Sequence, residues 1–255
     1  MKNYLSLLMI VAVSSGASTV IGAAGGLLVR NLSHKFHDIM LGAASGVMLA
    51  AAVLGLIFPA AEMELPGALA MTVAGVFAGA AIVSVLDKIT PHLHRLAGVD
   101  HEEHLHNSGT AKTLLFIAAI ALHKIPEGLA SGVSFGTGNL SDILTVAGSI
   151  TLQNIPEAMV VIAPLLTIGV TVKRSLLISC GIGAVSMIST LAGFALVSIF
   201  SFVLPFMLSL AGGTMLYVVS DEMIPETHSH GCEKESTFAL IAGFMLILVL
   251  QKVLG

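Results

Sequence analysis

Long apolar runs separated by short polar connections dominate the chain. Eight of these runs reach about twenty residues, which is the length an α-helix needs to cross the hydrocarbon core of a bilayer. They cover approximately 4–29, 38–58, 66–86, 112–136, 141–168, 174–201, 203–221 and 236–254. The pattern predicts an all-α, polytopic membrane protein in which residues 1–255 form a single domain, a bundle of eight transmembrane helices.

Composition agrees with a membrane protein, because 56% of the 255 residues are hydrophobic and only 10% are charged, against about 25% charged in soluble domains. Residues 1–18 resemble a secretory signal peptide, but the apolar run continues to Leu28, which favours a first transmembrane helix. The net charge of −4 argues against nucleic acid as a partner. Cys180 and Cys232 form neither a disulfide framework nor a zinc-binding spacing, and the sequence assigns them no role.

The distribution of Lys and Arg predicts the orientation in the membrane. Basic residues gather in the connections that face the cytoplasm. With the N-terminus outside, the outer segments contain only Lys2 and Lys252, whereas the inner connections contain Arg30, Lys35, Lys88, Arg95, Lys112, Lys173, Arg174 and Lys234. This bias places both termini outside the cytoplasm, as an even number of spans also requires.

Two similar polar segments interrupt the apolar runs 112–136 and 141–168. They supply His123, Lys124, Glu127, Gln153, Asn154 and Glu157. Charged groups at membrane depth are costly and mark ion or substrate pathways. At about 100° per residue, each glutamate lies between its two polar neighbours on the helix. If the two helices face each other, Glu127 and Glu157 can bridge two adjacent positions. His123 and Gln153 border the first position. Lys124 and Asn154 border the second.

Pro126 and Pro156 follow the polar pairs and each removes one backbone donor from its helix. The carbonyl groups that this frees are tolerated at membrane depth only where they face protein or a hydrated cavity. The same level of both helices therefore offers carboxylates, an imidazole, amides and carbonyl oxygens, a collection that suits a divalent cation. The structural alternative is a buried ion pair of Lys124 with a glutamate that only holds the bundle together.

Further candidate ligands lie towards the predicted inner side. The polar connection at about 88–111 contains His101, His104 and His106 among acidic residues, and neutral imidazole is a common metal ligand. The inner ends of the third and seventh runs carry Asp87, His92, His94, Asp221 and Glu222, which are candidates for a ladder of weaker sites. Met48 lies within the second run, either as core filler or with its thioether facing a metal path.

Four motifs together resemble the ZIP (Zrt/Irt-like) family of metal-ion transporters. They are His-Lys-Ile-Pro-Glu-Gly at 123–128, Gln-Asn-Ile-Pro-Glu-Ala at 153–158, Asp-Glu-Met-Ile-Pro-Glu-Thr-His at 221–228 and Asp-Lys-Ile-Thr-Pro-His-Leu-His at 87–94. The resemblance covers nearly the whole chain. It implies eight helices with both termini outside, a position in the inner cell membrane, and commonly a homodimer. It also implies uptake of zinc or a related divalent ion into the cytoplasm, as a substrate and not as a cofactor.

The resemblance also implies roles for individual residues. His123, Glu127, Gln153 and Glu157 match the main transport-site ligands, with Asn154 nearby and Met48 a weaker match. Asp87, His92, His94 and Glu222 match the ligands of the exit route, and Asp221 lies beside them. The mixed set of His and carboxylate ligands suits Zn²⁺, and also Cd²⁺, Fe²⁺ or Mn²⁺.

Two departures from the family pattern affect the second position. Lys124 stands where members with a two-metal centre typically have Asn, and Ala184 aligns with a Glu of the sixth helix. Both changes remove metal ligands. Our hypothesis is that the Lys124 ammonium occupies this position as a tethered cation, so that only one metal ion binds.

Two other functions compete with metal uptake. An intramembrane metalloprotease would need two His four residues apart around a Glu, and the chain contains no His-Glu-x-x-His string. The sequence therefore does not predict an enzyme. A proton-coupled antiporter that uses Lys124 and Glu127 as its exchange pair, without moving a transition metal, is the remaining alternative.

Overall fold

The computed structural model describes residues 2–28, 33–89, 121, 123–167, 169–229 and 231–254. All secondary structure among these residues is helical, which confirms the all-α prediction. Six described segments are long and apolar enough to cross a membrane: Leu5–Leu28, His34–Ala61, Ala68–Leu86, Val172–Ile199, Ser201–Thr227 and Glu233–Val253. The count of eight spans and the orientation stay predictions.

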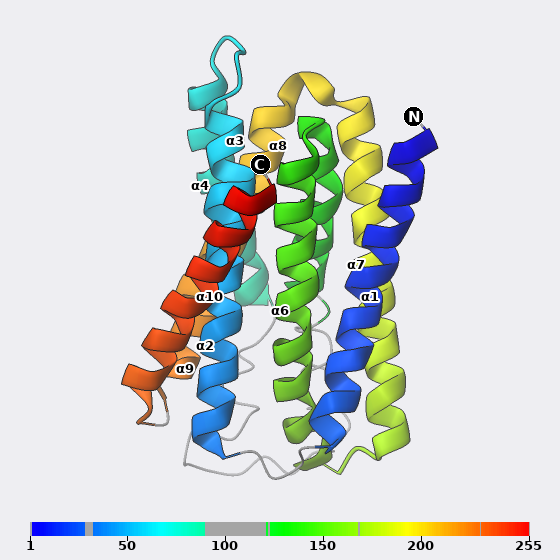
Figure 1. Ribbon diagram of the computed structural model, residues 1–255, viewed down its shortest axis with the longest axis vertical. Helices are drawn as coiled ribbons and strands as arrows, with labels where there is room; N and C mark the ends of the chain where they lie inside the picture. Colours follow the sequence, from blue (N-terminus) through cyan, green and yellow to red (C-terminus); the bar gives the residue numbers. More distant parts are fainter. Residues whose placement is uncertain are drawn as a thin grey trace.

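The first half of the chain contains α1 (Lys2–Leu28), α2 (His34–Ala50), a π-helical segment (Ala51–Ile57), α3 (Phe58–Ala61) and α4 (Ala68–Ile89). A helix over 123–133 follows and continues into a 3₁₀ turn, Ser134–Thr137. The second half contains α6 (Leu140–Thr167), α7 (Val172–Ile199), a 3₁₀ turn (Ser201–Val203), α8 (Leu204–Val218), a second π segment (Val219–Met223), α9 (Ile224–Thr227) and α10 (Glu233–Leu254). Both ends of the described chain lie at the same end of the bundle (Figure 1).

Local sequence signals explain where several helices begin and end. The Ser33 hydroxyl accepts a hydrogen bond from the backbone N–H of Phe36 at the start of α2, and Thr171 caps α7 in the same way. At the end of α6, Gly169 adopts a left-handed φ of 87°. The N–H of Val170 then donates to the carbonyl of Leu165, which closes the helix with a Schellman-type turn.

A π segment interrupts each of two helical runs, and each of these runs ends a few residues beyond its predicted span. After the first, Phe58 N–H donates to Val53 O, five residues back. The next donor in that register would be Pro59, which has no N–H, so the carbonyl of Leu54 loses its helical partner. Gln251 at the end of α10 replaces that donor, with its Nε2 3.2 Å from Leu54 O.

The second π segment corrects the predicted end of the seventh span at residue 221. The helical run continues through α9 to Thr227, and Pro225 again follows the π turn. Asp221 and Glu222 therefore lie inside a helical run and not beyond its end. A π turn contains one extra residue, which changes the direction of the side chains within it.

The helices form two groups that are each held together by close backbone contact. In the first, called the α1 group, α1, the helix over 123–133, α6 and α7 pack together. A Cβ atom added to Gly16 would lie 2.8 Å from Gly183 O, and one added to Gly128 would lie 2.6 Å from Ser186 O. Small residues allow this approach, which drives helix association in lipid.

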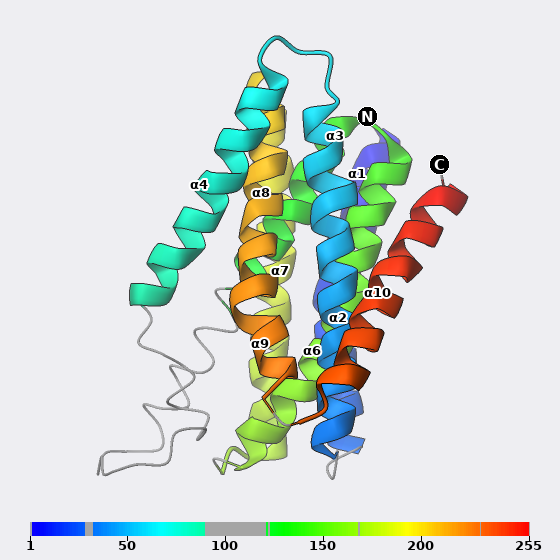
Figure 2. The same ribbon diagram turned by 90° about the vertical axis from the view of Figure 1, so that its left-hand side faces the viewer.

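The second, called the α2 group, contains α2, α4, α8 and α10, with the π segments and the short helices that continue α2 and α8. α2 packs on α10 and α4 packs on α8. A Cβ on Gly42 would lie 2.6 Å from Ser236 O, and one on Gly75 would lie 2.6 Å from Phe206 O. Figure 1 shows α2 and α10 on one side, α1 and α7 on the other, and α6 between them, while Figure 2 shows α4 beside α8.

Two glycines at the boundary between the groups each contact a side chain of the other group. Gly55 of the first π segment faces the Cγ2 of Val146 on α6, while the nearest backbone atom is 3.7 Å away. Gly136, in the 3₁₀ turn that follows the helix over 123–133, similarly meets the side chain of Leu204 on α8. At these two points the contact between the groups is made by side chains, while α2 and α6 also pack directly on each other.

Candidate metal centre

Lys124 is the centre of a buried polar network between the helix over 123–133 and α6. Its Nζ lies 2.7 Å from Glu127 Oε2, 2.6 Å from Glu157 Oε2 and 2.8 Å from Asn154 Oδ1. These three contacts use all three N–H groups of the ammonium. The side chain of Lys124 is 2% exposed, so its charge is withdrawn from solvent. One cation faces two carboxylates, which leaves a net charge of −1 if both are ionised.

Asn154 is held in place by α1. Its Nδ2 donates to the backbone carbonyl of Ser15 at 3.1 Å, which turns Oδ1 towards Lys124. The hydroxyls of Ser15 and Ser186 lie 2.6 Å apart and extend this network to α7. The sequence pattern gave no indication of Ser15, because a serine in a stretch of small residues gives no signal beyond helix packing.

His123 pairs with a residue from the other helix group. Its Nε2 lies 3.1 Å from Oε1 of Glu222 in the second π segment. That oxygen makes no hydrogen bond with good geometry to any described residue. The sequence grouped Glu222 with the exit route, whereas the structure places it in direct contact with His123. This pair therefore joins the centre to the α2 group.

Gln153 is buried without the partners that its amide requires. Its side chain is 1% exposed, and neither Oε1 nor Nε2 has a hydrogen-bond partner among the described residues. An unsatisfied buried polar group costs about 1–3 kcal/mol. Gln153 lies one helical turn from Glu157, and a buried amide of this kind calls for an explanation such as a bound water or ion.

The remaining predicted site residues differ in where they lie. Met48 is buried in the main apolar core, packed among alanines of α2 and the π segment. Asp221 is exposed. Ala184 is exposed on α7, so the α7 side chain in this network is Ser186 and not Ala184. The side chain of Asp87 lies outside the described residues, as do His92, His94, His101, His104 and His106.

The described side chains do not form a complete metal cage. No group of three or more His, Cys, Asp or Glu side chains among them is arranged to hold a metal ion. The ammonium of Lys124 stands between the carboxylates of Glu127 and Glu157. Both of its carboxylate contacts use Oε2, so Oε1 of Glu127 and Oε1 of Glu157 take no part in these two ion pairs.

Apolar spans around a buried cluster of ionisable groups define a membrane transport protein for ions, because charged groups are retained at membrane depth where they serve an ion pathway. The sequence matches the family described as ZIP zinc transporter over residues 87–251.

Curated relatives extend this similarity over nearly the whole chain. Zinc transporter GufA of Myxococcus xanthus is 38% identical, covering 97% of this chain and 98% of the relative. Zinc transporter ZIPB of Bordetella bronchiseptica is 36% identical, covering 94% and 78%. Zinc transporter ZupT of Streptococcus mutans is 25% identical, covering 98% of each chain. The protein belongs to the ZIP family. It is thus a multi-pass protein of the inner membrane and a transporter, not an enzyme.

Proposed function

We propose that this protein carries Zn²⁺, or a related divalent ion such as Cd²⁺, Fe²⁺ or Mn²⁺, into the cytoplasm. The site would consist of His123, Glu127, Gln153 and Glu157, between the helix over 123–133 and α6. The names of the relatives support zinc as the substrate. The mixed set of imidazole, amide and carboxylate ligands supports a divalent transition metal.

One observation carries this proposal: a single ammonium contacts both glutamates. Both carboxylates therefore reach one and the same cation, which supports the proposal that they act on a shared ion. Lys124 donates a hydrogen bond to Asn154, so these two residues border the same one of the two positions between the helices. In this proposal the ammonium takes the place of a second metal, and one divalent ion binds on the side of His123 and Gln153.

Alternating access would move the ion through this site. The two helix groups are each held by backbone contacts and meet through side chains, an arrangement that permits one group to rock against the other. The ion would exchange water for His123 and the two glutamates. It would then leave past Glu222 towards Asp87, His92 and His94, with His101, His104 and His106 as cytoplasmic ligands.

Two features of the proposal rest on the family resemblance and sequence pattern. The inward direction follows from the predicted orientation, with both termini outside. The homodimer follows from the resemblance. Membership of a zinc-transporter family gives no support to the proton-coupled antiporter. Metal uptake that persists without a pH gradient would separate the two mechanisms.

Zinc uptake into proteoliposomes tests the central assignment. We expect Glu157→Ala to reduce the initial rate to that of empty vesicles, because the ion loses one of its two carboxylates. Glu235→Gln is the matched control, since Glu235 is an exposed acid at the start of α10. Full uptake by Glu157→Ala, with the variant correctly folded by gel filtration, would refute the site.

A further inference from the structure

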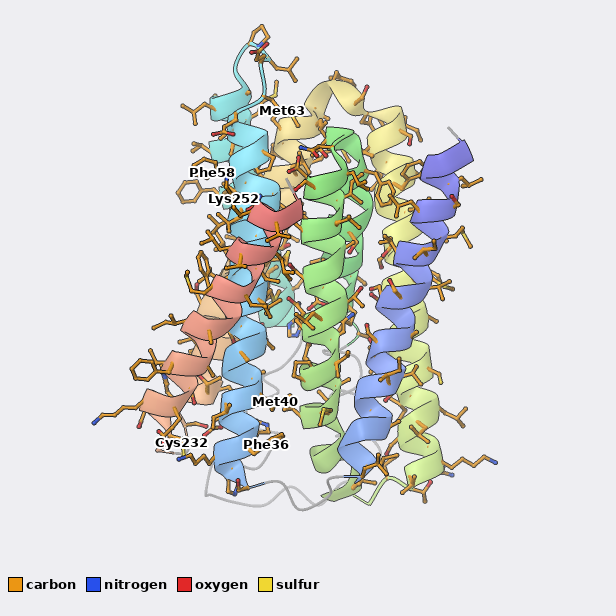
Figure 3. The ribbon with its side chains drawn as sticks, in the orientation of Figure 1. Phe36, Met40, Phe58, Met63, Cys232 and Lys252 are labelled. Atoms are coloured by element: carbon orange, nitrogen blue, oxygen red, sulfur yellow. The ribbon has the colours of Figure 1, made fainter. Side chains whose placement is uncertain are left out.

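Ser15 on α1 and Ser186 on α7 form a buried pair of hydroxyls. Their oxygens lie 2.6 Å apart, and the two side chains are 1% and 0% exposed, so neither hydroxyl meets bulk water. In Figure 3, α1 and α7 lie on the opposite side of the bundle from Phe58 on α3 and Lys252 on α10, which belong to the α2 group. The pair therefore joins two helices of one group and does not cross the boundary between the groups.

Close backbone contact surrounds this hydroxyl pair. A Cβ atom added to Gly183 would lie 2.5 Å from the carbonyl oxygen of Gly16, so α1 and α7 touch backbone to backbone. In the same turn of α7, the carbonyl oxygen of Ser186 would lie 2.6 Å from a Cβ atom added to Gly128. This turn of α7 therefore contacts both α1 and the helix over 123–133, which carries two members of the central network.

The backbone carbonyl of Ser15 links the hydroxyl pair to the centre. It accepts a hydrogen bond from Asn154 Nδ2 at 3.1 Å. A side-chain amide that donates on one side presents its oxygen on the other, and Asn154 Oδ1 accepts from Lys124 Nζ at 2.8 Å. If the amide turned over, two donors would face each other at Lys124. The position of Ser15 therefore fixes which end of Asn154 the ammonium meets.

We propose that Ser15 and Ser186 are positioning residues of the transport site. Their hydroxyl bond fixes α1 against α7, so that the carbonyl of Ser15 holds the Asn154 amide towards Lys124. Glycine contact sets how closely α1 and α7 approach. A hydrogen bond depends on both distance and angle, and so it also limits how far one helix slides or turns on the other. This inference rests on the proposed function, because the ammonium borders the site proposed for the metal.

Zinc uptake by Ser15→Ala with Ser186→Ala tests the positioning role. Removing both hydroxyls together leaves neither one unsatisfied, so the melting temperature should stay close to that of the wild type. A purely structural role therefore predicts normal uptake into proteoliposomes. The positioning role predicts a KM for Zn²⁺ about fivefold higher at an unchanged maximal rate, because an ammonium without its oriented acceptor competes with the metal for the carboxylate oxygens.

A second hydroxyl pair between helices of the same group provides the matched control. Ser14 on α1 and Thr151 on α6 have side-chain oxygens 3.4 Å apart, but the described hydrogen bonds that lead to Lys124 do not pass through this pair. Ser14→Ala with Thr151→Val also removes two hydroxyls at once. Its KM for Zn²⁺ and its maximal rate should equal those of the wild type.

Asn154→Ala tests whether the serines act through the amide. Equilibrium binding of Zn²⁺ to the detergent-purified proteins measures the affinity of variants with or without transport. In the wild-type background, loss of both serine hydroxyls should weaken binding about fivefold. In the Asn154→Ala background, the same loss should change the affinity less than twofold, because the group that the serines orient is already absent. Equal effects in the two backgrounds would overturn the proposal.

The remaining outcomes separate the positioning role from the proposed function. A wild-type KM for the double serine variant would overturn the positioning role, and so would a lower melting temperature with a lower maximal rate at unchanged KM. If Glu157→Ala is inactive in the same assay, the central assignment survives either result. If Glu157→Ala transports normally, the proposed function fails instead.

Discussion

At the scale of single residues, the ammonium of Lys124 neutralises part of a buried negative charge. We expect Lys124→Met to lower the free energy of unfolding by about 3–5 kcal/mol, because removing one member of a buried ionic cluster leaves the others uncompensated. Added Zn²⁺ should recover much of this loss, since a divalent ion that binds only the folded state stabilises it. Thermal unfolding in detergent, with and without Zn²⁺, measures both effects.

Lys173→Met is the control for this prediction, because Lys173 is exposed at the start of α7. Its melting temperature should equal that of the unchanged protein. If Lys124→Met and the wild type melt at the same temperature in the absence of metal, the ammonium does not stabilise the buried carboxylates as proposed. Two metal ions bound at the centre of the native protein would contradict it as well.

At the scale of helices, close backbone contact holds each group together. We expect Gly22→Ala to destabilise the protein by about 1–3 kcal/mol, because overpacking forces neighbouring backbone to shift. The added Cβ would lie 2.9 Å from Ile155 Cα and 3.0 Å from Ala158 Cβ on α6. Gly148→Ala on α6 is the control, since nothing lies within 4 Å of its added methyl group. Equal melting temperatures for the two variants would refute this packing argument.

At the scale of the whole molecule, transport requires the two helix groups to move past each other. In a protein whose own cysteines are replaced, we expect a disulfide between Gly55→Cys and Val146→Cys to stop zinc uptake, because it joins the groups. Reduction should restore uptake. The side chain of Val146 lies against Gly55, so a bond can form there.

Gly25→Cys with Met159→Cys is the matched control for this cross-link. A Cβ on Gly25 would lie 3.5 Å from Met159 Cγ, so this pair joins α1 to α6 within one group. Its disulfide should leave uptake unchanged. Normal uptake by the protein with a disulfide between positions 55 and 146 would show that transport does not require the two groups to move apart there.

Hydrophobic pattern alone predicted most of the helical runs to within a few residues, because the length of a membrane span is dictated by the bilayer and not by the neighbouring helices. Where the prediction was wrong, as at residue 221, a π turn extended the helix. Such a turn depends on packing and leaves no mark in hydropathy.

The helical spacing of His123, Glu127, Gln153 and Glu157 is likewise a property of the sequence, since it follows from the pitch of the helix. Tertiary structure decided which groups meet. The amine of Lys124 crosses to α6, Glu222 approaches His123, and Ser15 orients Asn154. These contacts join residues from different helices, and their geometry depends on how the backbones approach one another. One-dimensional pattern does not contain that information.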